Sequence, residues 1–267
     1  MKLLFSEAAP DHAHYVYPYA IWGFLEPGET PADAFAAGFL PSSLALDRFY
    51  LTRQIRIPLA EWKPTSENRR ILRKAAALRV QLVPRSEFDY SADRRRNWLA
   101  YAHARFGAGV MPGERLDRIL ASPVITHLLH FTDRTTGQDV GTALMYLQSP
   151  RLAYYYYAFF ALGPNDKSVG MEMMTQAVEH FAKAGWTHLH LGTCYTEQAL
   201  YKTQFAPLEF FNGFRWSRNL EELKHLVRIP PGNQHRLETP EFLKFQPSPP
   251  LELAHGSNFQ VLPTRPA

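Results

Sequence analysis

The feature that most constrains the fold is the regular order of apolar runs and helical patterns in the second half of the chain. Apolar and aromatic runs at 124–131, 140–147 and 152–161, each bounded by polar turns, predict three successive strands. A turn at 163–170 then leads into a helical pattern that runs to Lys183 and is closed by Gly185. The same criteria predict four further elements: a strand at 186–191, a helix at 196–204, a strand at 208–216 and a helix capped by Asn219 and ending at 226. We therefore expect an α/β fold with a mixed sheet.

The first half has a less regular pattern and more positive charge. Residues 47–58 alternate apolar and polar side chains, which predicts one half-buried strand. A basic helix is expected at 66–74 with Ser66 as its N-cap, then a strand at 78–83 and a second basic helix from Ser91 to residue 106. Glycines at 107–113 mark a boundary. We expect three parts: a basic N-terminal subdomain (1–107), a domain built on the mixed sheet (108–230) and an extended proline-rich tail (231–267).

Composition limits the class of protein. The net charge is +4, with a sequence pI of about 9.1, and the bases concentrate between 48 and 105. The lone Cys194 excludes an internal disulfide framework and a cysteine-based metal cluster, so we expect no metal and no cofactor. The longest apolar run, 152–162, is too short to cross a bilayer. The first residues do not fit a signal peptide, because the acidic Glu7 ends their short apolar stretch. We expect a cytoplasmic protein with no membrane partner.

The order hairpin, long strand, loop, helix, strand, short helix, strand resembles the GNAT acyltransferase superfamily. In that fold a helix N-terminus faces the acyl donor, because unsatisfied backbone amides and the helix dipole stabilise developing negative charge. Here that position is 167–170, where we expect the amides of Ser168, Val169 and Gly170 to polarise the donor carbonyl, with Asp166 and Val169 facing the substrate. The acetyl-CoA loop of the superfamily has spaced glycines, whereas this loop has one, and an ordinary helix start is the alternative.

Residues 199–205 (Ala-Leu-Tyr-Lys-Thr-Gln-Phe) resemble the late GNAT segment whose tyrosine often serves as a general acid. Tyr201 could therefore protonate the leaving group, and a positive charge on Lys202 would make it a better donor. A tyrosine that packs by its ring and leaves its hydroxyl at the surface is the alternative interpretation.

Longer strings resemble the arginyl-tRNA–protein transferases. Residues 66–74 read Ser-Glu-Asn-Arg-Arg-Ile-Leu-Arg-Lys, as in the family's "Ser-x-x-Arg-Arg-x-Leu-Arg-Arg/Lys" segment. Residues 167–170 resemble its "Ser-Leu-Gly" helix start. Leu191-Gly192 followed by the residues at 201–209 resembles its "Leu-Gly … Met-x-Tyr-Lys-x-x-Phe-x-Pro-x-Glu" signature, and Trp216 fits the tryptophan that follows. Order and spacing agree over 47–226.

This resemblance implies transfer of an amino acid, classically arginine, from aminoacyl-tRNA to the N-terminal amine of an acceptor protein or peptide. It implies that Glu209 holds the acceptor ammonium. It also assigns tRNA phosphate contacts to four basic residues, Arg69, Arg70, Arg73 and Lys74, and makes Arg94–Arg96 further candidates. A solvated basic face is the alternative for these helices.

The family's N-terminal cysteine cluster is absent here, since 11–41 contains no cysteine. Two rival functions remain: an acyl-CoA-dependent N-acyltransferase, and a non-catalytic relative that binds RNA or peptide. His188 and His190, two residues apart on one strand face, and Cys194 are best interpreted as packing residues.

Overall fold

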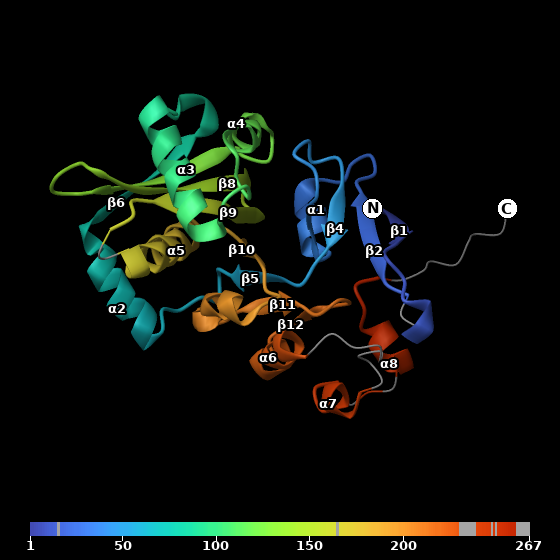
Figure 1. Ribbon diagram of the computed structural model, residues 1–267. Helices are drawn as coiled ribbons and strands as arrows, with labels where there is room; N and C mark the ends of the chain where they lie inside the picture. The colour runs from blue at the N-terminus through green and yellow to red at the C-terminus, as the bar shows by residue number, and fades with distance from the viewer. Residues whose placement is uncertain (15–16, 164–165, 230–238, 247, 249, 260–267) are drawn as a thin grey trace.

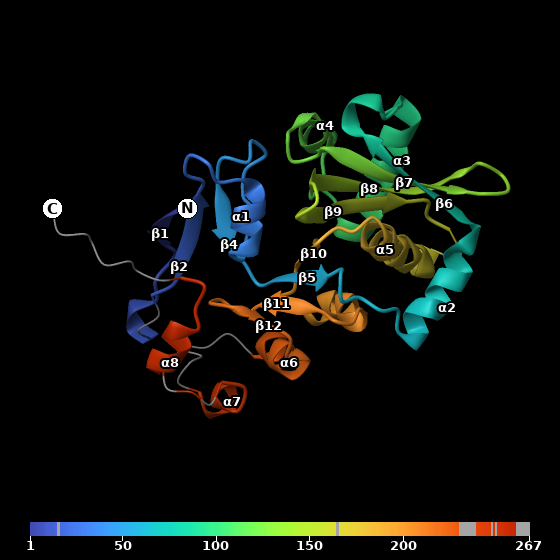
Figure 2. The ribbon, with the colours of Figure 1, turned by 180° about the vertical axis from the view of Figure 1, so that it is seen from behind.

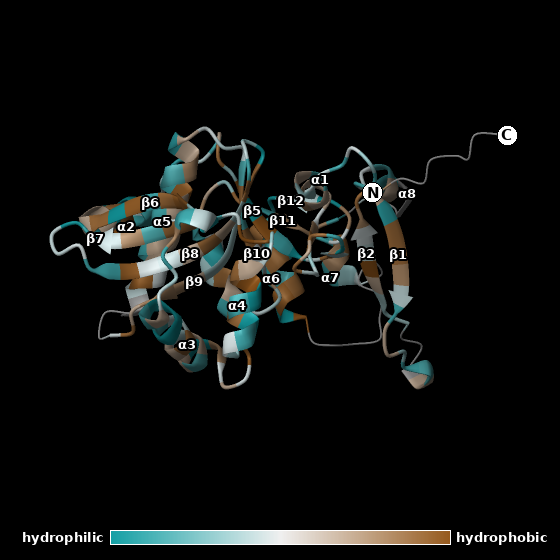
Figure 3. Ribbon diagram, turned by 90° about the horizontal axis from the view of Figure 1, so that it is seen from above, coloured by the Kyte–Doolittle hydropathy of each residue, from teal (hydrophilic) through white to brown (hydrophobic). Residues whose placement is uncertain are grey.

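The computed structural model describes residues 1–14, 17–163, 166–229, 239–246, 248 and 250–259. The strands form two sheets that lie side by side (Figures 1 and 3). The smaller sheet has the order β1 (Lys2–Glu7), β2 (Tyr19–Phe24), β4 (Phe49–Leu51), β3 (Phe39–Pro41). The larger has eight strands in the order β12 (Trp216–Ser217), β11 (Glu209–Phe211), β5 (Gln54–Pro58), β10 (His188–Thr193), β9 (Leu152–Phe160), β8 (Asp139–Gln148), β7 (His127–Asp133), β6 (Leu78–Pro84).

One parallel pair lies within the larger sheet. β9 and β10 run parallel and are joined by the crossover helix α5 (Asp166–Lys183), while the other pairs described in this sheet are antiparallel. Their register covers only Leu152–Tyr154 against His188–His190, although β9 continues to Phe160 and β10 to Thr193. The two strands therefore separate toward their carboxyl ends. The expected mixed α/β, GNAT-like architecture is confirmed.

Helices cover both faces of the larger sheet. α5 packs on one face, with α2 (Ser66–Lys74) beside it (Figure 2), and α3 (Ala92–Phe106) and α4 (Gly113–Ala121) cover the other (Figure 1). The core divides in the same way: Leu129 contributes to the cluster under α5, and its neighbour Leu128 to the cluster under α3. Successive strand side chains point to opposite faces, so each strand supplies both layers.

The remaining helices are short. Those outside the tail are η1 (His12–His14), α1 (Pro31–Ala36), η2 (Ala75–Ala77), η3 (Arg85–Glu87), η4 (Glu197–Gln204) and α6 (Leu220–Arg228). The N-cap side chain of Asn219 accepts from Glu221 and Glu222, as predicted. α2 is instead capped by Thr65, whose hydroxyl accepts from the Asn68 amide, which leaves Ser66 as the first helical residue. In the described residues, no helix is long and apolar enough to cross a bilayer.

Two expected strands are each divided. Residues 47–58 form β4 and β5, which belong to different sheets because the chain crosses from one to the other at Thr52 and Arg53. Residues 208–216 form β11 and turn back into β12 as an antiparallel hairpin. Helices α1 and α4 were not predicted from the sequence.

The expected division into parts also changes. Residues 1–107 do not stand apart from the rest, because β5 and β6 are paired into the larger sheet with strands from the second half. Within 231–267, expected to be extended, the described residues include α7 (Pro240–Leu243) and α8 (Pro250–His255). Phe242 is only 2% exposed and joins the main core, so this stretch is anchored to the domain.

Candidate functional site

A cavity of about 570 Å³ lies where β9 and β10 separate. We call it the inner lobe. Its walls come from Tyr155 to Ala158 and Phe160 on β9, from the start of α5, from the end of α3, from Leu191 and from η4. Met171, Met174, Leu191 and Phe160 give it an apolar interior, and Tyr201 lines it from η4. The geometry is that of a pocket opened by two diverging parallel strands, with a helix N-terminus at its edge.

A second cavity of about 510 Å³, the outer lobe, shares Tyr156, Tyr157, Leu191 and Lys202 with the first. It lies between the two sheets: β2 and β4 contribute Trp22 and Tyr50, and α4 contributes Arg115. The two lobes therefore form one cleft with Lys202 at the junction.

Two of the tyrosines that line the inner lobe, Tyr201 and Tyr155, differ in exposure. Tyr201, predicted from the sequence, is 49% exposed, yet desolvation by the cleft walls raises its pKa, and a negative charge on Cys194 would add to this. The Tyr155 side chain is 6% exposed, and its hydroxyl has no hydrogen-bond partner within the described structure. Burial, and secondarily Tyr201, raises the pKa of Tyr155. A buried hydroxyl without a partner costs about 1–3 kcal/mol, so Tyr155 is a group for which a ligand is expected.

The sequence did not distinguish Tyr155 from its neighbours in the run at 154–157. Tyr154 is also buried, whereas Tyr156 and Tyr157 line both lobes. Alternation on the strand was the available signal, but a bulge between Leu144 and Met145 shifts the register opposite these tyrosines. Only the folded sheet decides which of these tyrosines lines which lobe.

Lys202 is held at the junction by a hydrogen bond of 2.9 Å from its Nζ to the Thr193 carbonyl. Burial lowers its pKa. Its Nζ lies 5.9 Å from the centroid of the Tyr201 ring. The expected tuning of Tyr201 toward easier proton release is not seen, because the pKa of Tyr201 is raised by burial. The raised pKa favours the neutral hydroxyl of Tyr201, a form that is able to donate a hydrogen bond.

The start of α5 lies at the edge of the inner lobe. Lys74 of α2 donates to Ser168 Oγ and forms an ion pair with Glu172 at 2.8 Å, which ties α2 to this turn. Because the helix begins at Asp166, the Gly170 amide is placed to donate to the carbonyl of residue 166. The amides of the first turn, including that of Ser168, have no acceptor carbonyl within the helix. Gly170 contributes space instead: a Cβ there would lie 3.1 Å from Phe160.

Val169 and Asp166 are the other two substrate-binding residues expected near α5. Val169 packs against the main core. The backbone of Asp166 opens α5, but its side chain lies outside the described residues.

Glu209 is separate from this cleft. Its carboxylate accepts from Arg56 at 2.7 Å and from Arg218 at 3.0 Å, and the Arg56 guanidinium stacks on the Trp216 ring at 3.7 Å. Burial alone would raise the pKa of Glu209, but the two arginines outweigh it and lower the pKa. Glu209 lines neither lobe, and its bonds join β11, β5 and the segment before α6.

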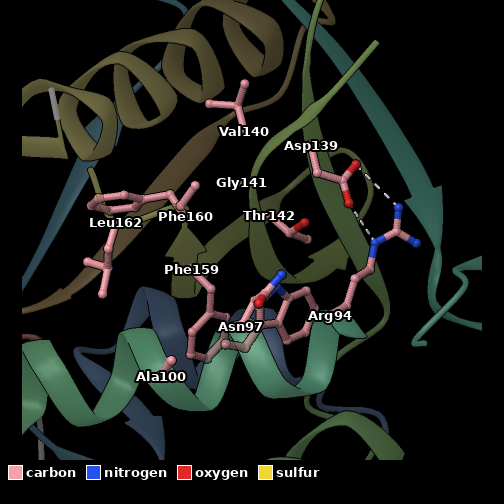
Figure 4. Close-up of a pocket in the computed structure, with 12 residues that line it drawn as sticks. Arg94, Asn97, Ala100, Asp139, Val140, Gly141, Thr142, Phe159, Phe160 and Leu162 are labelled. Atoms are coloured by element: carbon pink, nitrogen blue, oxygen red, sulfur yellow. Dashed lines mark hydrogen bonds and ion pairs between the residues drawn. The ribbon is translucent and has the colours of Figure 1, made fainter. Parts of the chain in front are cut away.

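The basic helices differ in how far their charges are neutralised. On α3 each arginine of the run 94–96 bonds to a carboxylate: Arg94 to Asp89 and Asp139, Arg95 to Asp117, Arg96 to Asp93. Figure 4 shows Arg94 bound to Asp139 at the wall of a smaller cavity of about 320 Å³.

The four basic residues of α2, Arg69, Arg70, Arg73 and Lys74, are all exposed. Arg70 pairs with Glu67, Lys74 pairs with Glu172, and Arg69 donates to the Pro64 carbonyl. In the described part of the chain Arg73 forms no ion pair. The charge that α2 leaves open to an anion is therefore mainly that of Arg69 and Arg73.

The remaining candidates pack in the interior. His190 is 2% exposed and its Nδ1 lies 2.8 Å from Gln54 Oε1, and Cys194 is fully buried. Burial, then the charge of Arg56, lowers the pKa of His188 to about 4. Over the described ranges, no group of three or more histidine, cysteine or acidic side chains is arranged to hold a metal ion.

No protein-family model matches the chain. It is similar to several proteins named aspartate/glutamate leucyltransferase. The one from Rhizorhabdus wittichii is 24% identical over 173 residues, 61% of this chain and 64% of that protein. The one from Chromohalobacter salexigens is 25% identical over 215 residues, 74% and 85% of the two chains. The one from Gluconobacter oxydans is 28% identical over 169 residues, 61% and 68%.

The chain spans 64–66% of the length of the first two such relatives, from Rhizorhabdus wittichii and Sphingopyxis alaskensis. The names of these relatives specify leucine, so the comparisons do not support arginine as the transferred amino acid.

Among solved structures, FemX is similar over 64% of this chain and 63% of its own, at 10% identity and a TM-score of 0.43. The C-terminal domain of a putative lysylphosphatidylglycerol synthetase from Agrobacterium fabrum covers 59% of this chain and 49% of its own, at 18% identity and a TM-score of 0.41. These likenesses are distant, and the fold assignment rests on the strand order and the single parallel pair of the protein itself.

Proposed function

We propose that the protein is an aminoacyl-tRNA–protein transferase that moves leucine from tRNA to the N-terminal amine of an acceptor that begins with aspartate or glutamate. The observation that carries the proposal is the two-lobed cleft: a lobe with an apolar interior beside a helix N-terminus meets, at Lys202, a second lobe that lies between the two sheets. The resemblance over 47–226 and the similarity to leucyltransferases support the same chemistry.

The donor's acyl group occupies the inner lobe in this proposal. Met171, Met174 and Leu191 provide an apolar wall for a leucyl side chain. The first-turn amides of α5 stabilise the negative charge that grows on the ester carbonyl oxygen. The unpartnered Tyr155 hydroxyl supplies a hydrogen bond to the donor, which would offset the cost of its burial.

The reaction needs no redox step. The lone pair of the acceptor amine attacks the ester carbon, a C–N bond forms, and the C–O bond to the ribose breaks. One proton leaves the amine and one is gained by the ribose oxygen, so the balance closes without a further reactant. We assign Tyr201 to donate a hydrogen bond or proton to the departing oxygen, which suits a hydroxyl kept neutral by a raised pKa.

The outer lobe would receive the acceptor. Its lining residues include Arg115 and Lys202 and no carboxylate. Positive charge near an ammonium lowers the pKa of that ammonium, because the charged form is repelled. The lobe would thus increase the fraction of acceptor amine that is neutral and able to attack.

The tRNA body would lie along α2, which docks on the start of α5 through Lys74. Arg69 and Arg73 are the exposed bases best placed to contact phosphates there. An aminoacyl-tRNA donor also makes the cytoplasm the proposed location.

The test is a transfer assay with purified protein. Radiolabelled leucyl-tRNA, arginyl-tRNA and acetyl-CoA are each offered with peptides that begin with Asp, Glu, Asn or Lys. The expected result is leucine on the Asp and Glu peptides only. Acetylation, or arginine transfer in place of leucine, would refute the assignment.

A further inference from the structure

We propose that Arg115 binds the side-chain carboxylate of the acceptor's first residue, and that Arg118 extends the same anion-binding surface. This inference rests on the proposed function, whose acceptor begins with aspartate or glutamate. It adds the residue that recognises the acidic side chain, a role that the sequence resemblance did not assign to any residue.

Arg115 lies where two cavities meet. It lines the outer lobe, and it also lines a neighbouring cavity of about 330 Å³ together with Arg118 and Ser43. Both cavities also include Ser42 and Tyr156. A side chain that enters the outer lobe next to Lys202 can therefore reach the Arg115 guanidinium without leaving the cleft.

The charge on this surface is not compensated. Arg115 donates from Nη1 to the Val110 carbonyl at 2.7 Å, which fixes one corner of the guanidinium. Across the described ranges, neither Arg115 nor Arg118 has a carboxylate partner, and the lining residues of both cavities include no acid. A guanidinium held at one nitrogen presents its other N–H groups in the planar fork that matches a carboxylate.

The arginines of α3 differ from Arg115 and Arg118, because they do have carboxylate partners. All three arginines at 94–96 have found carboxylates, although they are also on the surface. Arg115 and Arg118 on α4 are also exposed, but Arg115 lines the hollow formed with Trp22 and Tyr50, and Arg118 lines the neighbouring cavity. An uncompensated cation at the wall of a cavity is a candidate binding site for a small anion.

A phosphate of the tRNA is the other anion to consider. The geometry favours the peptide, because Arg115 lines the outer lobe, whereas α2 is bonded through Lys74 to Ser168 of α5, the helix that lines the inner lobe from Gly170 onward. The hollow also has room for one side chain beside its aromatic walls, which suits a residue of the acceptor.

The experiment measures kcat/KM for peptides that begin with Asp, Asn, Glu and Gln, with leucyl-tRNA as the donor, for wild type, Arg115→Gln, Arg115→Lys and Arg118→Gln. Wild type should prefer Asp over Asn and Glu over Gln. Arg115→Gln should reduce that preference by about 10- to 100-fold, the usual range for losing a charge-assisted hydrogen bond. The loss should appear in the KM of the acidic peptides, with the Asn and Gln peptides little changed.

Arg115→Lys should keep part of the preference, and Arg118→Gln should give a smaller loss than Arg115→Gln. Arg151→Gln is the matched control, because Arg151 pairs with Asp33 and lines neither lobe. Its preference should equal that of wild type. Thermal melting of each variant checks that the fold is intact.

Three results would overturn the inference. An Arg115→Gln enzyme with the wild-type preference would show that another group reads the acid. An equal loss for all four peptides, with weaker tRNA binding by filter assay, would assign Arg115 to the RNA. A wild-type protein that transfers leucine to no peptide would remove the proposed function itself, and with it this assignment, a failure visible before any variant is made.

Discussion

The inner and outer lobes differ in what builds them. The inner lobe is made by β9, β10 and the helices of the larger sheet, and its walls are mostly aromatic and sulfur-containing, with Arg105 and the shared Lys202 as its cations. The outer lobe lies between the two sheets and carries arginine, lysine and serine on its walls. Donor chemistry would thus depend on one rigid frame, while acceptor selection would depend on how the smaller sheet and α4 meet it. Changes in the outer lobe could then alter specificity and leave the reaction intact.

The largest expected effect is that of Tyr201→Phe in the inner lobe. The ring stays and only the hydroxyl is removed, so turnover should fall about 100-fold, the scale of general acid catalysis. Acidic and neutral acceptor peptides should be affected equally, and affinity for leucyl-tRNA should hold, because the hydroxyl acts mainly in the transition state. Single-turnover rates and filter binding measure the two quantities. A full single-turnover rate would reduce Tyr201 to a packing residue.

Tyr155→Phe should lower activity and leave the free energy of unfolding unchanged or raised. Its hydroxyl is buried without a partner in the described structure, so removing it relieves a cost of about 1–3 kcal/mol while taking a hydrogen bond from the donor. We expect a decrease of about 10-fold in kcat/KM, seen with every acceptor. Urea unfolding and the transfer assay are run together.

Tyr146→Phe is the control, a buried tyrosine that lines neither lobe. If Tyr155→Phe destabilises the protein as well, the Tyr155 hydroxyl has a hydrogen-bond partner in solution. Tyr201 is then the one tyrosine still assigned to donate a hydrogen bond in the inner lobe.

Reversal of Arg69 and Arg73 to Glu should weaken tRNA binding and leave peptide KM unchanged, which would place the RNA on the inner side alone. The slope of log K against log salt should become shallower by about 1 for each phosphate that the protein no longer neutralises. Arg96→Glu, already paired with Asp93 in the wild type, is the control and should change the slope less. Unchanged binding after the α2 reversal would mean that its charges form a solvated face.

The smallest effect concerns stability and should not distinguish the lobes. His188 on β10 has a folded pKa of about 4 against an ordinary 6.5, with burial as the main cause. As pH falls, His188 is protonated first in the unfolded chain, because its pKa is higher there. The contribution of neutral His188 to the free energy of unfolding is therefore complete above pH 6.5 and is lost toward pH 4. Stability at pH 5 should drop by on the order of 1–2 kcal/mol from this group.

His188→Leu should flatten the dependence of Tm on pH between about 7.5 and about 5, whereas substitution of the exposed His103 on α3 should not. A profile for His188→Leu as steep as that of wild type would assign the acid sensitivity to other groups.

Much of the larger sheet was predictable because its signals are local. Periodicity and neighbouring residues were enough to predict β7, β8 and β9, the helix that ends at Lys183 and the cap at Asn219. Tyr201 and Lys202 were found by their string and do line the inner lobe. Sequence reasoning placed Glu209 beside the acceptor, whereas in the structure its carboxylate accepts from Arg218, nine residues away, and from Arg56, 153 residues away.

What the sequence determined by itself is therefore the order of elements, the position of the helix start near residue 166 and the chemical identity of the tyrosine–lysine pair. The tertiary structure decided which charges are available and which hydroxyls are unpartnered in the described residues. Those properties depend on what lies opposite each side chain: Asp139 opposite Arg94, aromatic and polar walls with no acid opposite Arg115, and the inner lobe opposite Tyr155. Periodicity reports the direction of a side chain along its own element, but electrostatic pairing and desolvation are set by neighbours far apart in the chain.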